Sequence, residues 1–69
     1  MNLSRAQLDG NLDQLEADLP GLLESSSRTD ARAALRTRGD EILRSAASED
    51  DRRHARERIE AMTREHGLG

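Results

Sequence analysis

The chain has 69 residues, a net charge of -3 and a pI of about 5.3, and it contains no cysteine and no aromatic residue. A chain of this length forms one domain with a thin core, here residues 1–69. The missing cysteines exclude disulfides and thiolate metal sites, and without a long apolar run we expect no signal peptide, no membrane span and a cytoplasmic protein.

The composition indicates an all-α fold. Valine, phenylalanine, tyrosine and tryptophan are absent, whereas alanine, leucine, arginine and glutamate, which favour helices, are frequent. We therefore predict a small three- or four-helix bundle. The expected helices are approximately 5–18, 20–25, 29–47 and 49–66.

The first predicted helix carries a leucine seam. Ser4 and Gln7 form a capping-box pattern that starts the helix at residue 5. Leucines then follow at steps of four, three, four and three, which is the spacing of one helical face: Leu8, Leu12, Leu15, Leu19 and Leu22, with Leu23 beside them. The seam keeps its phase across Gly10, so we expect no break there. Pro20 removes a backbone donor and is expected to end or kink the helix, leaving a short helix over 20–25.

The serine run at 25–27 predicts a connection, and Thr29 is expected to cap the next helix. This helix has an apolar side that ends in Ile42 and Leu43. Arg38 stands where a further large apolar residue of that side would belong, and Gly39 follows it. The helix either divides there or continues to about residue 47 with a weak middle, and we expect it to continue.

Ser48 followed by three acidic residues is a strong signal for the start of the last helix. Its apolar stripe comprises Ala55, Ile59, Met62 and His66. Gly67 is expected to terminate the helix in a left-handed conformation, with Leu68 closing the turn.

No pattern of catalytic or metal-binding residues is evident in the sequence. His54 and Glu57 share a helical face, but no second pair of this kind completes a metal site. The serines have cap and linker roles, and the chain has no lysine for a phosphate-binding loop of the usual form. We therefore predict no catalytic, cofactor-binding or metal-binding residue, and no enzyme activity.

Nucleic-acid binding is the alternative function. Arginines recur along the third and fourth predicted helices, at Arg28, Arg32, Arg36, Arg38, Arg52, Arg53 and Arg56. Acidic residues are interspersed among them, however, and no aromatic side chain is available to stack on bases. Residues 1–27 carry one arginine against five acidic residues, whereas residues 28–69 carry ten against nine, so the basic excess is small.

The favoured function is that of a non-catalytic protein-interaction module: a small regulator, inhibitor or adaptor. A thin core and a long leucine seam favour association with another protein or with a second copy as a homodimer. The predicted contact residues are Leu8, Leu12, Leu15, Leu19, Leu22 and Leu23. The competing interpretation is that the seam is the interior of a monomeric bundle. All cations are arginine, as in a GC-rich bacterial or phage genome.

Overall fold

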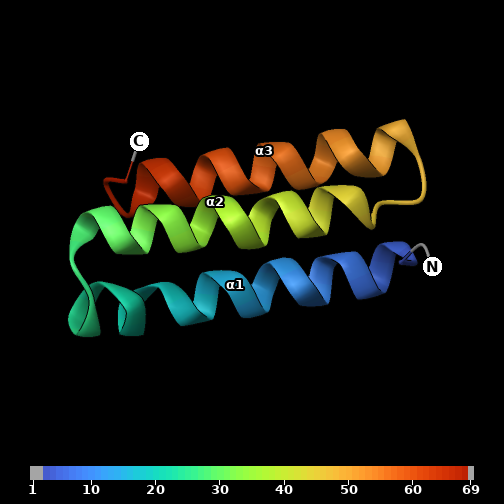
Figure 1. Cartoon of the computed structure of the whole chain (residues 1–69). Coiled ribbons are helices and arrows are strands. Elements are labelled where there is room, and N and C mark those ends of the chain that lie inside the picture. Colours follow the sequence, from blue (N-terminus) through green and yellow to red (C-terminus); the bar gives the residue numbers. More distant parts are fainter. Residues whose placement is uncertain (1–2, 69) are drawn as a thin grey trace.

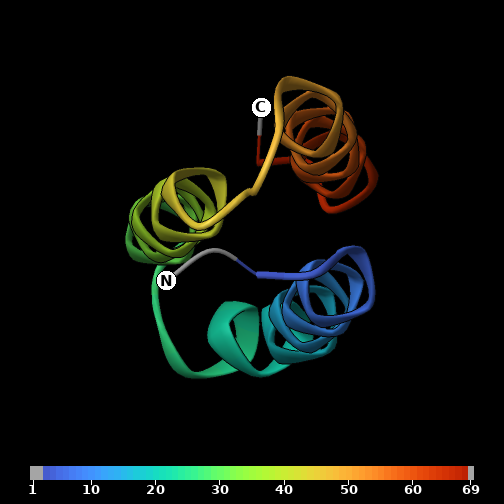
Figure 2. The ribbon, with the colours of Figure 1, turned by 90° about the vertical axis from the view of Figure 1, so that its right-hand side faces the viewer.

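The structure is a computed structural model that describes residues 3–68. It contains three helices, α1 (Arg5–Ser25), α2 (Arg28–Arg44) and α3 (Glu49–Glu65), packed as a bundle. α1 and α3 run in the same direction and α2 runs against both (Figure 1). Seen along the bundle, the helices stand at the corners of a triangle (Figure 2). The all-α bundle is therefore confirmed, with three helices.

The leucine seam of α1 faces the interior of this bundle. Leu8, Leu12, Leu15 and Leu19 are each 0% exposed. α2 and α3 contribute smaller faces to the same core, formed by Ala31, Leu35, Ile42, Ala55 and Met62, and Leu68 joins them from the segment after α3. The core of the described residues contains no polar or charged side chain. One leucine-rich helix therefore packs against two alanine-containing helices, which compensates for the absence of aromatic residues.

Pro20 lies inside α1, so the separate helix predicted over 20–25 is wrong: of the two outcomes expected at Pro20, an end or a kink, the helix does not end there. Proline removes one helical donor and disfavours the helix interior by about 3 kcal/mol. The burial of Leu19 before it, and the packing of Leu22 and Leu23 against the core after it, favour continuation. The last turn of α1 lies off the axis of the rest of the helix, as a proline kink requires (Figure 2).

The caps explain the other helix boundaries. The Ser4 capping box with Gln7 is present, as predicted. α2 begins one residue before the predicted Thr29, because the Ser27 hydroxyl accepts the Asp30 amide at 3.1 Å and caps the helix instead. At the start of α3 the Ser48 hydroxyl accepts the Asp51 amide at 3.1 Å.

α2 ends at Arg44, three residues before the predicted end. The Leu3 amide donates to the Ser45 carbonyl at 2.8 Å, and Leu3 pairs with Ala46 in an isolated bridge. The N-terminal segment thus occupies the Ser45 carbonyl, which in a longer α2 would accept a hydrogen bond from a helical amide four residues further along. Ser48 must also be extended in order to cap α3, with φ -142° and ψ 168°.

The end of α3 follows the predicted pattern to within one residue. Gly67 has φ +66°, and its amide donates to the Arg64 carbonyl while the Leu68 amide donates to the Thr63 carbonyl at 2.8 Å. These two bonds define a Schellman cap. Leu68 is 2% exposed, so the cap also anchors the chain in the core.

Gly39 of α2 lies directly against Ile59 of α3. The helix continues through it, as expected, but the glycine is buried rather than a weak point in the helix. A Cβ at position 39 would lie 3.1 Å from the Ile59 Cδ1 atom, whereas a Cβ at Gly10 would meet nothing within 4 Å. None of the helices in residues 3–68 is long and apolar enough to cross a membrane.

These two glycines are expected to respond differently to substitution. Gly10→Ala should raise the free energy of unfolding by about 1 kcal/mol, because alanine is the better helix former and the added methyl meets no neighbour. Gly39→Ala should give less stabilisation or none, because Ile59 must move. Urea unfolding followed by circular dichroism measures both variants, and equal stabilisation would contradict the close approach at Gly39.

Candidate functional site

The predicted protein-binding leucines divide into two groups. Leu8, Leu12, Leu15 and Leu19 form the interior of the bundle and present no surface to a partner while the bundle is closed. Leu22 and Leu23, after the kink, are partly buried against the core and keep some exposed surface. A partner that binds the closed bundle therefore needs another contact surface in addition to these two residues.

Polar pairs join α1 to α3 along one edge of the bundle. The Arg5 guanidinium donates to Asp51 at 2.7 Å, and the Arg58 guanidinium donates to Asp13 at 2.9 Å. Between these pairs, His54 Nε2 lies 2.6 Å from Asp9 Oδ1. Because the two helices are parallel, each pair joins positions at a similar height. His54 thus contacts a carboxylate of α1, which the sequence spacing did not reveal.

A further pair joins α1 to α2, where the Arg38 guanidinium donates to Asp18 at 2.8 Å. A groove of about 250 Å³ lies beside it, lined mainly by polar residues: Asn11, Gln14, Arg38, Glu41, Ile42 and Ser45. Asp13 and Asp18 of α1 therefore contact arginines of the same chain, and Asp9 contacts His54. The acidic character expected for residues 1–27 is to this extent neutralised internally.

These contacts hold the pKa of two carboxyl groups below the ordinary value. The pKa of Asp9 is lowered chiefly by its hydrogen bond to His54, and the pKa of Asp18 is lowered chiefly by its hydrogen bond to Arg38. Both groups lie at the surface, so the pairs orient the helices more than they stabilise the fold.

A second groove runs between α2 and α3 and differs in character. Its floor is apolar and is formed by Leu35, Gly39, Ile59 and Leu68, with a cavity of about 230 Å³. The polar residues of its lining are Arg32, Arg36, Asp40 and Thr63. The floor exists because Gly39 has no side chain and Ile59 lies directly against it.

The arginines predicted as one ridge are divided by the fold. Arg32 and Arg36 line the α2/α3 groove, whereas Arg38 lies on the side of α2 that faces α1 and is paired there. Arg28 lies about one helical turn before Arg32, and its guanidinium approaches Gly67 at the end of α3. A cation at the C-terminal end of a helix is favourable.

The arginines of α3 have separate environments. Arg52 pairs with Glu49 at 3.2 Å, and Arg53 is exposed. Arg56 is also exposed, and it precedes the groove residue Ile59 by three positions, so it stands on the edge of α3 nearest the groove. The arginines that line the groove, Arg32 and Arg36, thus both come from α2, and Asp40 is the acidic residue in its lining.

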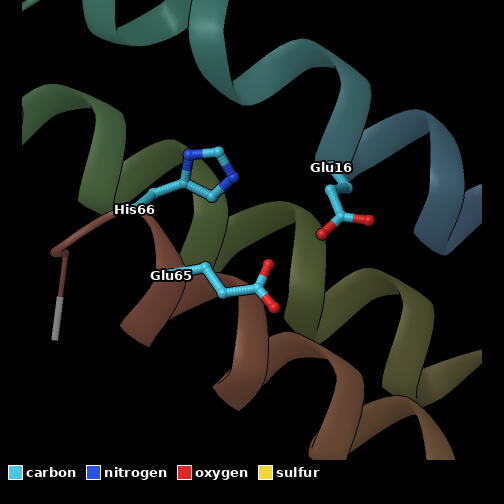
Figure 3. A group of neighbouring side chains, drawn as sticks. All are labelled: Glu16, Glu65 and His66. Carbon is cyan, nitrogen blue, oxygen red and sulfur yellow. The ribbon is translucent and has the colours of Figure 1, made fainter.

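The structure also brings together three ligating side chains that no sequence pattern connected. Glu16 of α1 lies near Glu65 and His66 at the end of α3, and one ligand atom from each lies within 4.8 Å of the other two. Figure 3 shows the two carboxylates and the imidazole converging from both helices. The sequence places Glu16 about 50 positions from the other two residues, so only the packing of α1 on α3 reveals the group.

Comparison of the chain with protein-family models, with curated proteins and with solved structures found no match.

Acid is expected to weaken the fold through Asp9 and Asp18. Each carboxyl has an ordinary pKa of 3.8 that folding lowers, so the unfolded chain binds the proton more readily. The stabilisation is present above that value and is lost as the pH falls through the lower values of the folded state. The urea midpoint should therefore decrease between about pH 5 and about pH 3.

The double variant Asp9→Asn/Asp18→Asn should show a smaller decrease over the same interval, since neither position then binds a proton. Glu24→Gln, at an exposed position of α1, serves as the control and should behave like the parent chain. A decrease of equal size in the double variant and the parent would show that other carboxyls cause the acid sensitivity.

Proposed function

We propose that this protein is a non-catalytic interaction module that binds an acidic, amphipathic helix of a partner protein in the α2/α3 groove. The observation that carries the proposal is the combination of an apolar floor with two arginines of α2, Arg32 and Arg36, beside it. The role of such a module is that of a small regulator, inhibitor or adaptor in the cytoplasm. Leu22 and Leu23 would form a secondary contact surface at the kink of α1.

The shape of the groove favours a helix as its occupant. Two antiparallel helices form its walls, and a third helix laid between them would extend the bundle, as in other helix-in-groove complexes. The cavity of about 230 Å³ lies below the roughly 300 Å³ at which pockets for drug-sized ligands begin. It has room for one or two apolar side chains of a partner, which act as anchors.

The charges favour an acidic partner. Arg28, Arg32 and Arg36 repeat every four residues, which is a rise of about 6 Å per step along α2. Carboxylates four positions apart on a partner helix have the same spacing. No salt bridge within residues 3–68 engages these three arginines. Arg32 and Arg36 line the groove and are available to such carboxylates, whereas the Arg28 guanidinium lies near Gly67 at the end of α3.

A protein partner is favoured over nucleic acid by the same residues. Four arginines (Arg5, Arg38, Arg52 and Arg58) are committed to internal pairs, and Asp40 faces the groove. A phosphate backbone would meet this carboxylate as well as the arginines, and its bases would find no aromatic side chain for stacking. An apolar floor, in contrast, gains free energy by burying the leucines of a peptide.

The test uses a fluorescein-labelled peptide of about 18 residues with leucines at helical spacing and glutamates elsewhere. Its binding is followed by fluorescence anisotropy, and backbone amide shifts in NMR spectra locate the contact surface. The parent chain should bind this peptide, with shifts concentrated at Gly39, Ile59 and Thr63. Arg32→Glu/Arg36→Glu should weaken binding at least about tenfold, because two attractive pairs become repulsive.

The matched control is Arg53→Glu/Arg64→Glu, which makes the same change of charge at exposed positions of α3 outside the groove lining. It should bind almost as tightly as the parent. Equal weakening in both double variants would show attraction by net charge alone and would overturn the assignment of the groove.

Two further measurements separate the competing functions. Tighter binding of a labelled DNA duplex than of the peptide, with a steep dependence on salt, would establish nucleic acid as the ligand in place of protein. Light scattering gives the mass of the free chain, for which a monomer is 7.7 kDa. A dimer that buries the groove residues would replace the proposed partner by a second copy of the chain.

A further inference from the structure

The group formed by Glu16, Glu65 and His66 departs from the charge pattern of the α1/α3 edge. At successive heights along this edge, Arg5 faces Asp51, Asp9 contacts His54 and Asp13 faces Arg58. Beyond these pairs the Glu16 side chain approaches Glu65, about one turn further along α3 than the register of the other pairs, so a carboxylate lies near a carboxylate. Like charges this close repel each other unless a cation lies between them.

The protein itself supplies little positive charge at this position. The Arg58 guanidinium is 3.5 Å from Glu16 but only 2.9 Å from Asp13, which is its nearer partner. Glu65 takes part in no salt bridge within the described residues. The imidazole of His66 completes the group from the side of α3 (Figure 3).

The backbone that carries two of the three side chains is held firmly. Glu65 is the last residue of α3 and His66 is its C-cap, whose amide donates to the Met62 carbonyl at 3.0 Å. The Schellman cap at Gly67 and the buried Leu68 fix the turn that follows. On α1, Glu16 is next to the fully buried Leu15. The ligating groups therefore converge before any ion is bound.

We propose that Glu16, Glu65 and His66 bind a divalent transition-metal ion of the zinc class. One imidazole and two carboxylates are a donor set that zinc accepts with bonds of about 2.0 to 2.2 Å, leaving a fourth position for water. A tetrahedral ion holds its ligand atoms about 3.4 Å apart, so atoms within 4.8 Å reach it by small rotations of side chains. The imidazole disfavours Mg²⁺ and Ca²⁺, which prefer oxygen ligands.

Metal binding at this position would tie the middle of α1 to the end of α3. These helices share no direct connection in the chain, so the ion adds a link across the bundle. An ion bound only by the folded state stabilises that state in proportion to its occupancy. The site lies on the α1/α3 edge, away from the α2/α3 groove, and is independent of the proposed function.

Thermal unfolding with Zn²⁺ tests the site, followed by circular dichroism and compared with the same chain in EDTA. Saturating Zn²⁺ should raise Tm by at least about 5 °C. Co²⁺ should give visible d–d absorption of a nitrogen and oxygen site. The chain has no cysteine or aromatic residue to contribute other absorption above 250 nm.

Variants assign the ligands. His66→Ala and Glu65→Gln should each abolish the rise in Tm. Glu65 is exposed, so Glu65→Gln keeps the fold and still tests the site in the case that His66→Ala unfolds the chain. The controls His54→Asn and Glu57→Gln change the other histidine and another exposed acid of α3, and both should keep the rise. An unchanged Tm of the parent chain in Zn²⁺, an undiminished rise in Glu65→Gln, or a rise abolished by His54→Asn would overturn the assignment.

Discussion

The structure depends on the burial of four leucines of α1 between two helices that offer small side chains. Leu8, Leu12, Leu15 and Leu19 supply half of the buried large apolar side chains among the described residues, in a core without aromatic residues. Ala31, Ala55 and the buried Gly39 make room for them and bring α2 close to α3. This close approach leaves the apolar floor of the α2/α3 groove open at the surface. The groove is thus a consequence of how the core is filled.

The charges act on the arrangement of the helices as well as on partners. Apolar packing alone is tolerant of small sliding movements between helices, whereas a hydrogen-bonded polar pair at each height penalises them. The pairs of Arg5 with Asp51, of Asp9 with His54 and of Asp13 with Arg58 all fit one parallel register of α1 and α3. They also remove several charges from the free surface. The charge that a partner meets at the groove is therefore set by the arginines there, and it differs in sign from the net charge of -3 of the whole chain.

Local signals in the sequence predicted most of the fold. The capping box at Ser4, the start of α3 at Ser48 and the terminator at Gly67 all depend on residues within a few positions of one another, and all are present. The separate helix over 20–25 was wrong because leucines on both sides of the proline pack into the same core. The overlong α2 was wrong because Leu3, distant in the chain, takes the carbonyl of Ser45. The separation of Arg38 from Arg32, and the meeting of Glu16 with His66, likewise follow from helix packing, which no local pattern contains.

The parallel arrangement of α1 and α3 also has a mechanical meaning. Because three helices traverse the bundle an odd number of times, α1 begins at one end and α3 finishes at the other (Figure 1). The longest dimension of the bundle is 33 Å. Segments joined before α1 and after α3 would thus be held apart by the full length of the domain. A load applied between them would act along the helix axes and shear the three helices past one another, which requires many contacts to break together.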